Sequence, residues 1–372
     1  MYFLNGDTIY IKPDRCSASV EEQLDSCFKK LLKPGRRIFK LNFFAGVSTN
    51  HDYDALYAHV KIRVRQYFGD SLIFSLVAQP PIDCSILAEV FYFDEAIWKG
   101  QTLRDENSQA VLFGRDGNEI LVGHIQSNIY EGCRKNSETV FESLEKLLMN
   151  KGFELNHIIR QWNYIENILA LDYSKQRYQE FNDVRSSFYK NLFSSTGYPA
   201  ATGIGMNCGG VIVEFVAVKS TDAVNLPVNN PEQVAAYGYS NDVLVGSNHK
   251  TTPKFERARY LDLYGKKQLM ISGTASIRGE KTVGAGNPEE QTHVTIQNMQ
   301  RLYCADVLKS AAGAVLHPVY GHARIYIRNR NDYKIVKKTF RSYYGNLPVV
   351  YLVADICRKD LLVEIEGKVI LE

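Results

Sequence analysis

The sequence lacks several features that would indicate a membrane, a secretory or a nucleic-acid function. Its 372 residues contain no apolar run of transmembrane length, and residues 1–7 have neither the basic flank nor the apolar stretch of a signal peptide. Lysine and arginine number 44 against 41 aspartates and glutamates, so the net charge of +3 gives no electrostatic reason to expect nucleic-acid or membrane binding. We therefore expect a cytoplasmic protein whose partner is a small molecule.

Motifs for disulfides, metals and nucleotide cofactors are also missing. None of the seven cysteines forms a Cys-x-x-Cys pair, and the eight histidines include no His-x-x-x-His spacing, which disfavours a disulfide framework and a zinc site. The glycines of Gly203-x-Gly205 follow a proline and precede a predicted strand, so they make a poor dinucleotide fingerprint. We interpret them as shaping a cleft, and we expect neither a metal nor a cofactor.

The apolar pattern predicts helices and strands along the whole chain. The predicted helices span residues 20–32, 53–67, 137–150, 174–190, 291–311 and 333–344. The predicted strands span residues 8–11, 37–46, 71–79, 87–93, 110–115, 119–123, 157–163, 211–218, 260–263, 268–272 and 323–328. Residues 227–253 are polar and predict a linker or long loop, and residues 348–372 predict a closing β-hairpin around Arg358-Lys359-Asp360.

The order of these elements recurs in the two halves of the chain. The helix–strand–helix series that starts at residue 137 is matched by the series that starts at residue 291. The strand that carries Glu214 then matches the strand that carries Glu364. This order predicts an α+β protein of two similar units with a cleft between them. The expected domains are residues 1–222, with an N-terminal extension, and residues 223–372.

Two carboxylates in the last predicted strand are candidates for acid catalysis. Glu364 and Glu366 are two residues apart and therefore lie on one face of the strand. If that face is buried among Leu362, Val363 and Ile365, desolvation raises the pKa of a carboxyl there, as a general acid near neutral pH requires. If the face meets solvent, both are ordinary surface charges, and the pattern alone leaves this choice open.

Residues from about 260 to 367 resemble the YjgF/RidA-like fold. The motifs that carry the resemblance are Leu263-Tyr264-Gly265, Ile271-Ser272-Gly273, Ile325-Tyr326-Ile327-Arg328-Asn329 and Val363-Glu364-Ile365-Glu366. The resemblance implies that Glu364 holds the place of the catalytic carboxylate of the deaminating members. Those deaminases carry an arginine just after the proline that opens the penultimate strand, where this sequence has Val349-Val350. An ordinary imine deaminase is therefore not expected.

Over its whole length the chain resembles the chorismatases, which fuse two such units. The motifs are Arg177-Tyr178-x-x-Phe181-Asn182-x-x-Arg185, Tyr198-Pro199-Ala200-Ala201-Thr202-Gly203-Ile204-Gly205, Pro253-x-Phe255-x-Arg257-Ala258 and Ser272-Gly273-Thr274-Ala275-Ser276-Ile277. The resemblance implies cleavage of the enolpyruvyl ether of chorismate, a dicarboxylate, with release of pyruvate.

The resemblance also implies roles for individual residues. Glu364 would be the general acid that protonates the enol ether. The residues implied in substrate binding are Tyr178, Arg185, Tyr239, Arg257, Gly273 and Thr274. Cys357 holds the position of a cysteine found in the branch that makes 3-hydroxybenzoate. A two-residue turn after Cys357 would put it on the face of Glu364, whereas a three-residue turn would not.

Three functions therefore remain open from the sequence. The first is a cofactor-independent chorismatase that forms 3-hydroxybenzoate and pyruvate. The second is a hydrolase that forms 3,4-dihydroxycyclohexa-1,5-diene carboxylate, or a mixture containing 4-hydroxybenzoate. The third is a YjgF-like ligand-binding protein without turnover. YjgF-like units commonly form trimers, whereas a fused pair can be a monomer, so both oligomeric states are open.

Overall fold

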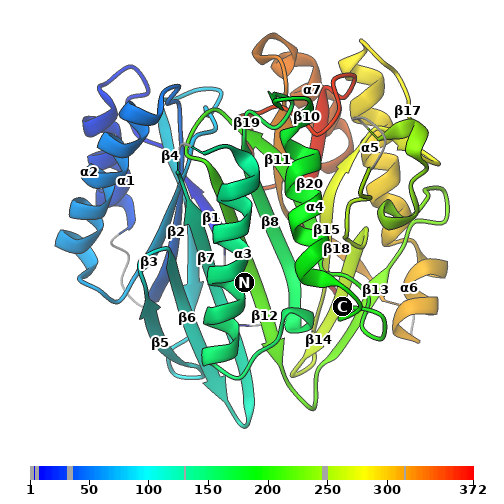
Figure 1. The fold of residues 1–372 in the computed structure, drawn as a ribbon, viewed down its shortest axis with the longest axis horizontal. Coiled ribbons are helices and arrows are strands. Elements are labelled where there is room, and N and C mark those ends of the chain that lie inside the picture. Colours follow the sequence, from blue (N-terminus) through cyan, green and yellow to red (C-terminus); the bar gives the residue numbers. More distant parts are fainter. Residues whose placement is uncertain (1–3, 5–7, 32–36, 130, 245–249, 314–315) are drawn as a thin grey trace.

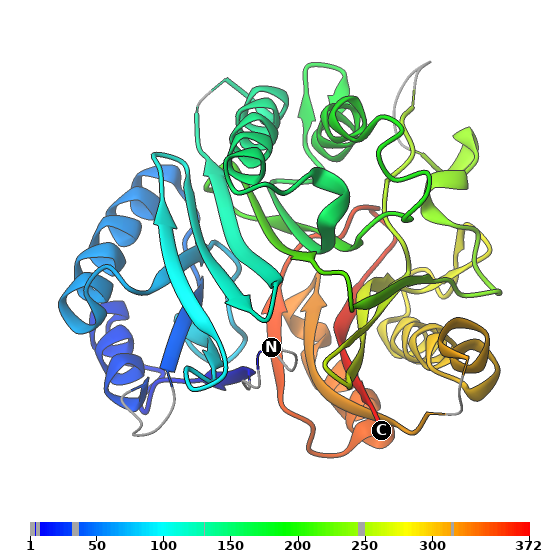
Figure 2. The ribbon, with the colours of Figure 1, turned by 90° about the horizontal axis from the view of Figure 1, so that it is seen from below.

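Three large β-sheets with helices around them form most of the part of the protein that the structure describes. The computed structural model describes residues 4, 8–31, 37–129, 131–244, 250–313 and 316–372 (Figure 1). Seen from below in Figure 2, the three sheets surround a common centre and the helices lie mainly on the outside. Within these described ranges, no helix is both long and apolar enough to span a bilayer.

The first sheet is built from the N-terminal part of the chain. Its strand order is β1-β4-β2-β3, with β2 parallel to β3 and antiparallel to β4. The elements are β1 (Thr8–Ile11), α1 (Val20–Leu31), β2 (Arg37–Ala45), α2 (Asn50–Phe68), β3 (Ile73–Val77) and β4 (Ile86–Phe93). All six elements were predicted from the sequence, with bounds shifted by up to three residues.

The second sheet has six strands in the order β11-β8-β12-β7-β6-β5. Its elements are β5 (Lys99–Arg104), β6 (Ser108–Arg115), β7 (Asn118–Ser127), α3 (Cys133–Asn150), β8 (Ile158–Glu166), α4 (Arg177–Tyr189), β11 (Ala200–Met206) and β12 (Val211–Lys219). Between β8 and α4 a short ribbon is formed by β9 (Leu171–Asp172) and β10 (Lys175–Gln176). The predicted Asp116-Gly117 turn joins β6 to β7, with positive φ at both residues.

The third sheet has the order β13-β14-β15-β20-β18-β19. Its elements are β13 (Val224–Val228), β14 (Ala258–Leu263), β15 (Lys266–Ala275), α5 (Pro288–Leu302), α6 (Ala305–Ala312), β18 (Pro318–Ile327), α7 (Tyr333–Tyr344), β19 (Val349–Val353) and β20 (Val363–Leu371). A small hairpin of β16 (Ile277–Arg278) and β17 (Lys281–Thr282) follows β15.

One strand–helix–strand–strand unit occurs three times. In each copy the first strand pairs in parallel with the second and antiparallel with the third. The copies are β2-α2-β3-β4, β8-α4-β11-β12 and β18-α7-β19-β20. The sequence comparison found the second and third copies but left the first in an N-terminal extension. The division into domains 1–222 and 223–372 stays a prediction, because sheet boundaries alone do not define independently folding units.

The predicted closing hairpin is wrong in its pairing. Both of its strands exist, but β19 and β20 lie on opposite sides of β18 and pair with that strand. The polar break at Arg358-Lys359-Asp360 belongs to a loop, residues 354–362, that connects β19 to β20 across β18. A local turn pattern does not identify the partner of a strand, and here the buried β18 supplies both partners.

Two further predictions also need correction. The helix expected over residues 291–311 is two helices, α5 and α6, because the chain turns at Tyr303 and Cys304. The turn lets α6 pack beside β13 while α5 packs on β15 and β20. The glycine-containing stretch after Pro199 is the strand β11, which runs parallel to β8. Most of residues 227–253 is irregular as expected, although Val228 and Pro227 end β13 and residues 245–249 lie outside the described ranges.

Candidate active site

A cavity lies where the second and third sheets meet. Its inner part has a volume of about 50 Å³ and is lined by α4 and β11 from one side and by β15, β20 and the 354–362 loop from the other. Three of its residues, Gln176, Val243 and Arg358, also line an outer cavity of about 450 Å³. The cleft expected between the two units of the repeat therefore exists.

Glu364 supplies the one carboxyl group among the lining residues of the inner cavity. It lies on β20, opposite Ala275 of β15 and Tyr326 of β18. Its side chain is buried, and this burial, together with the charge of Glu366, raises its pKa to about 8. Within the described chain no donor forms a hydrogen bond to this carboxyl. A carboxyl with this pKa is mostly protonated at neutral pH.

Gly273 makes room for this carboxyl group. It lies at an irregularity in the pairing of β15 with β20, between Ile271 and Thr274. A Cβ atom on Gly273 would overlap Oε1 of Glu364. The backbone N–H of Gly273 donates to Oγ1 of Thr202 at 3.0 Å. Gly273 lines the cavity as expected, whereas Thr274 does not, and its hydroxyl donates to the carbonyl of Ser272 at 2.9 Å.

Arg257 and Tyr239 meet at the same cavity. Nη2 of Arg257 donates to the Tyr239 hydroxyl at 2.6 Å and to the carbonyl of Val234 at 2.8 Å. The side chain of Arg257 is buried, and its Nε has no partner in the described chain. No carboxylate among the described residues forms an ion pair with this guanidinium. A buried cation without a counter-charge is costly, which points to an anionic ligand beside it.

Helix α4 contributes Tyr178 directly and Arg185 from behind. Tyr178 lines the cavity over Gly203, and burial raises the pKa of its hydroxyl. Arg185 is buried but does not line the inner cavity; its Nη2 donates to Oδ1 of Asn182 at 2.6 Å, and Asn182 does line it. Nε of Arg185 and Nδ2 of Asn182 are unpartnered among the described atoms. Arg185 therefore places a positive charge behind Asn182, which itself lines the inner cavity.

Cys357 lines the cavity from the loop before β20, on the side where Glu364 lies. The sequence made the position of Cys357 depend on the length of a hairpin turn, but β19 and β20 do not form a hairpin with each other. Burial, followed by the nearby Glu364, raises the pKa of the Cys357 thiol to about 12. The group is therefore a neutral thiol and a weak hydrogen-bond donor at physiological pH.

The sequence did not identify Asn182, Arg160 or Thr202 as parts of this region. Asn182 lay within a quoted motif, but its position on the helix gave no reason to separate it from Arg185. Arg160 is the one basic residue of strand β8, and it lies behind Glu364 together with Thr202 of β11. A basic residue directly after the apolar pair Ile158-Ile159, inside a predicted strand, was the signal that could have identified it.

Comparisons with known proteins agree with this architecture. Residues 96–217 match the family model described as "Chorismatase FkbO/Hyg5-like, N-terminal". A "3-hydroxybenzoate synthase" of Streptomyces hygroscopicus is 30% identical over 255 residues, which cover 64% of this chain and 69% of that protein. A "Chorismatase" of the same organism is 31% identical over 236 residues, covering 62% of this chain and 66% of the relative. A crystal structure of a chorismatase aligns over 98% of both chains at 23% identity, with a TM-score of 0.74, which confirms the predicted α+β fold.

Proposed function

Because the chain belongs to the chorismatase family, we propose that it converts chorismate to 3-hydroxybenzoate and pyruvate, with Glu364 as the general acid. The observation that carries the proposal is the buried, protonated carboxyl of Glu364 in a cavity shared with an unpaired guanidinium, that of Arg257. The carboxyl group can protonate the substrate, and the guanidinium can bind a carboxylate of the substrate.

The reaction begins with proton transfer to carbon. The methylene carbon of the enolpyruvyl ether accepts the proton of Glu364, and positive charge develops on the carbon that carries the ether oxygen. Cleavage of the bond between the ether oxygen and the ring then leaves that oxygen as the keto oxygen of pyruvate. The ring cation keeps its own hydroxyl oxygen, which moves to the neighbouring carbon, and it loses one ring proton to the Glu364 carboxylate as it becomes 3-hydroxybenzoate. A carboxyl whose pKa lies at about 8 is mostly protonated at pH 7 and is still acidic enough to donate.

The two carboxylates of chorismate require cations that are not already neutralised. Arg257 meets this requirement, and its contact with Tyr239 holds the guanidinium toward the cavity. Arg185 adds a second buried and unpaired guanidinium, which acts through Asn182. Charge-assisted hydrogen bonds from such groups contribute about 1.5–3 kcal/mol each.

Cys357 is proposed to direct the product toward 3-hydroxybenzoate. Its thiol and the Glu364 carboxyl line the same cavity, so the thiol contacts the ring as the side chain leaves. The relative named "3-hydroxybenzoate synthase" supports this product. The formation of 3-hydroxybenzoate and pyruvate conserves all atoms of chorismate, whereas the hydrolase branch consumes one water molecule.

Product chromatography after incubation of the purified protein with chorismate tests the proposal. We expect 3-hydroxybenzoate and pyruvate in equal amounts without an added cofactor, and no pyruvate from Glu364→Gln. A diene diol with pyruvate, or an admixture of 4-hydroxybenzoate, would contradict the role of Cys357 but keep the acid. No turnover by the wild-type protein would leave a ligand-binding protein and refute the proposed reaction.

A further inference from the structure

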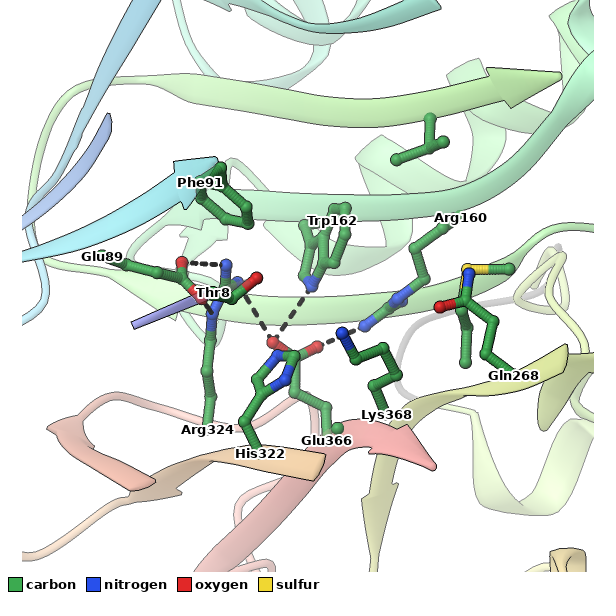
Figure 3. Close-up of a pocket in the computed structure, with 13 residues that line it drawn as sticks. Thr8, Glu89, Phe91, Arg160, Trp162, Gln268, His322, Arg324, Glu366 and Lys368 are labelled. Atoms are coloured by element: carbon green, nitrogen blue, oxygen red, sulfur yellow. Dashed lines mark hydrogen bonds and ion pairs between the residues drawn. The ribbon is translucent and has the colours of Figure 1, made fainter. Parts of the chain in front are cut away.

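Three buried ion pairs connect the three units, and a fourth, Arg324–Glu366, lies within the third unit. Each unit contributes one cation from its first strand and one carboxylate from its last strand, and each cation pairs with the carboxylate of a different unit. The pairs are Lys40–Glu214, Arg324–Glu89 and Arg160–Glu366. All six side chains are buried. Figure 3 shows two of these pairs, with Glu366 between Arg324 and Arg160.

The third pair departs from the pattern of the other two. In the first unit, Glu89 on the last strand lies opposite Asn42, which is two residues after the cation Lys40 on the first strand. In the second unit, Glu214 lies in the same way opposite Trp162, which is two residues after Arg160. In the third unit the residue two places after Arg324 is Tyr326, and the carboxylate opposite it is Glu364. By this register Arg160 would pair with Glu364, but it pairs with Glu366, two residues farther along β20.

The carboxylate of Glu366 accepts hydrogen bonds from side chains on three strands, β8, β11 and β18. The donors are Nη2 of Arg160, Nε1 of Trp162 (3.0 Å), Oγ1 of Thr202, Nη1 of Arg324 (3.1 Å) and the hydroxyl of Tyr326 (3.0 Å). A carboxylate with this many donors is held in one position. Through Thr202, whose hydroxyl also accepts from Gly273, it is connected to the backbone beneath the carboxyl of Glu364.

We propose that Glu366 is a positioning residue for the acid: by holding Arg160, it keeps the Glu364 carboxyl out of an ion pair and available to the substrate. This inference rests on the proposed role of Glu364 for its effect on turnover. Glu366 itself does not line the inner cavity beside Glu364, so it acts only through its neighbours.

The charges around Glu364 support this role. The titratable groups that face it are Glu366 on its own strand, Arg160 of β8, Arg257 before β14, Tyr178 of α4 and Cys357 of the preceding loop. The charge of Glu366 raises the pKa of Glu364, whereas the two arginines lower it. Side chains two residues apart on a strand are roughly 6.7 Å apart, so loss of the Glu366 charge lowers the pKa of Glu364 by roughly one to two units.

The pH dependence of kcat/KM tests the proposal in three variants. The alkaline limb is the fall in kcat/KM at high pH, as Glu364 loses its proton. In Glu366→Gln this limb moves to lower pH by roughly one to two units, so that kcat/KM at pH 8 is roughly tenfold or more below its value on the low-pH plateau. In Arg160→Gln the limb moves to higher pH, because a cation that lowers the pKa of Glu364 is lost. The double variant restores the limb toward the wild-type position.

A matched control separates this role from general destabilisation. Glu89→Gln removes Arg324–Glu89, an equally buried ion pair between two units, and the alkaline limb of this variant stays at the wild-type pH. A limb that is unmoved in Glu366→Gln, or that moves equally in Glu89→Gln, would overturn the proposal. If Glu366→Gln does not fold, Arg160→Gln decides the question alone, since an unmoved limb there refutes it as well.

An infrared measurement makes the test independent of chorismate. The C=O band of protonated Glu364, identified by its loss in Glu364→Gln, is followed against pH in the wild-type protein and in Glu366→Gln. A band that titrates at lower pH in Glu366→Gln supports the inference even if chorismate is not the substrate. A band that titrates at the same pH in both proteins overturns it.

Discussion

Replacing Glu364 by glutamine should stabilise the protein, and the gain should grow with pH. The fold raises the pKa of this carboxyl from 4.5 to about 8, mainly through burial. In the unfolded chain the group ionises near pH 4.5, so between pH 4.5 and 8 the native state binds one proton that the unfolded state has lost. The stability of the wild-type protein is therefore lost progressively as the pH rises through this range.

The magnitude follows from the width of that range. Each pH unit changes the free energy of unfolding by about 1.36 kcal/mol, so 3.5 units correspond to about 5 kcal/mol. Below pH 4.5 both proteins carry a neutral side chain at this position, and the difference between them is constant. Above pH 8 the wild-type carboxylate is ionised in both states, and the advantage of Glu364→Gln reaches its maximum.

Urea denaturation at a series of pH values from 5 to 9 measures the effect. The other titrating groups are shared by the two proteins, so they cancel in the difference between the free energies of unfolding. Glu106→Gln, a substitution at an exposed position, serves as the control and is measured at the same pH values. A difference that does not change with pH for Glu364→Gln would refute the raised pKa and, with it, the argument for a general acid.

Other substitutions test substrate binding and product choice. Arg257→Ala should raise KM roughly 10- to 150-fold, because it removes a charge-assisted contact of about 1.5–3 kcal/mol, and Arg257→Lys should recover part of this loss. Steady-state kinetics, with the exposed Arg65→Ala as a reference, measures the effect; an unaltered KM would place Arg257 outside the binding site. Cys357→Ala should shift the product from 3-hydroxybenzoate toward the diene diol, and an unchanged ratio on chromatography would leave Cys357 a packing residue.

The fold was predictable wherever periodicity alone decides an element. Residues 333–344 form α7 as expected, because their apolar side chains recur at helical spacing and Gly345 ends the helix. Strand partners were not predictable in the same way. The pairing of β19 and β20 with β18 depends on contacts far apart in sequence, which a local turn pattern does not encode.

The sequence predicted which residues lie at the cavity better than it predicted what surrounds them. Two glutamates on one face of an apolar strand made Glu364 and Glu366 candidates, and the resemblance selected Glu364 and added Arg257 and Tyr178; all three of these line the inner cavity. Arg160, a cation that lowers the pKa of Glu364, comes from another sheet, and no spacing along the chain connects the two. Cys357 lies in the loop before β20, so the length of a hairpin turn could not predict whether its side chain lies on the same side as Glu364.

Carrying three copies of one unit on a single polypeptide allows the copies to diverge one at a time. In an assembly of identical subunits, any substitution at a subunit boundary appears at every boundary together. Here the junctions are encoded separately, and two of them retain a carboxylate paired with a cation at the shared register, Glu89 and Glu214. At the third, Glu364 has no such partner in the part of the chain that the structure describes. A broken symmetry in the charge pattern thus marks the junction at which a carboxyl group lines a cavity.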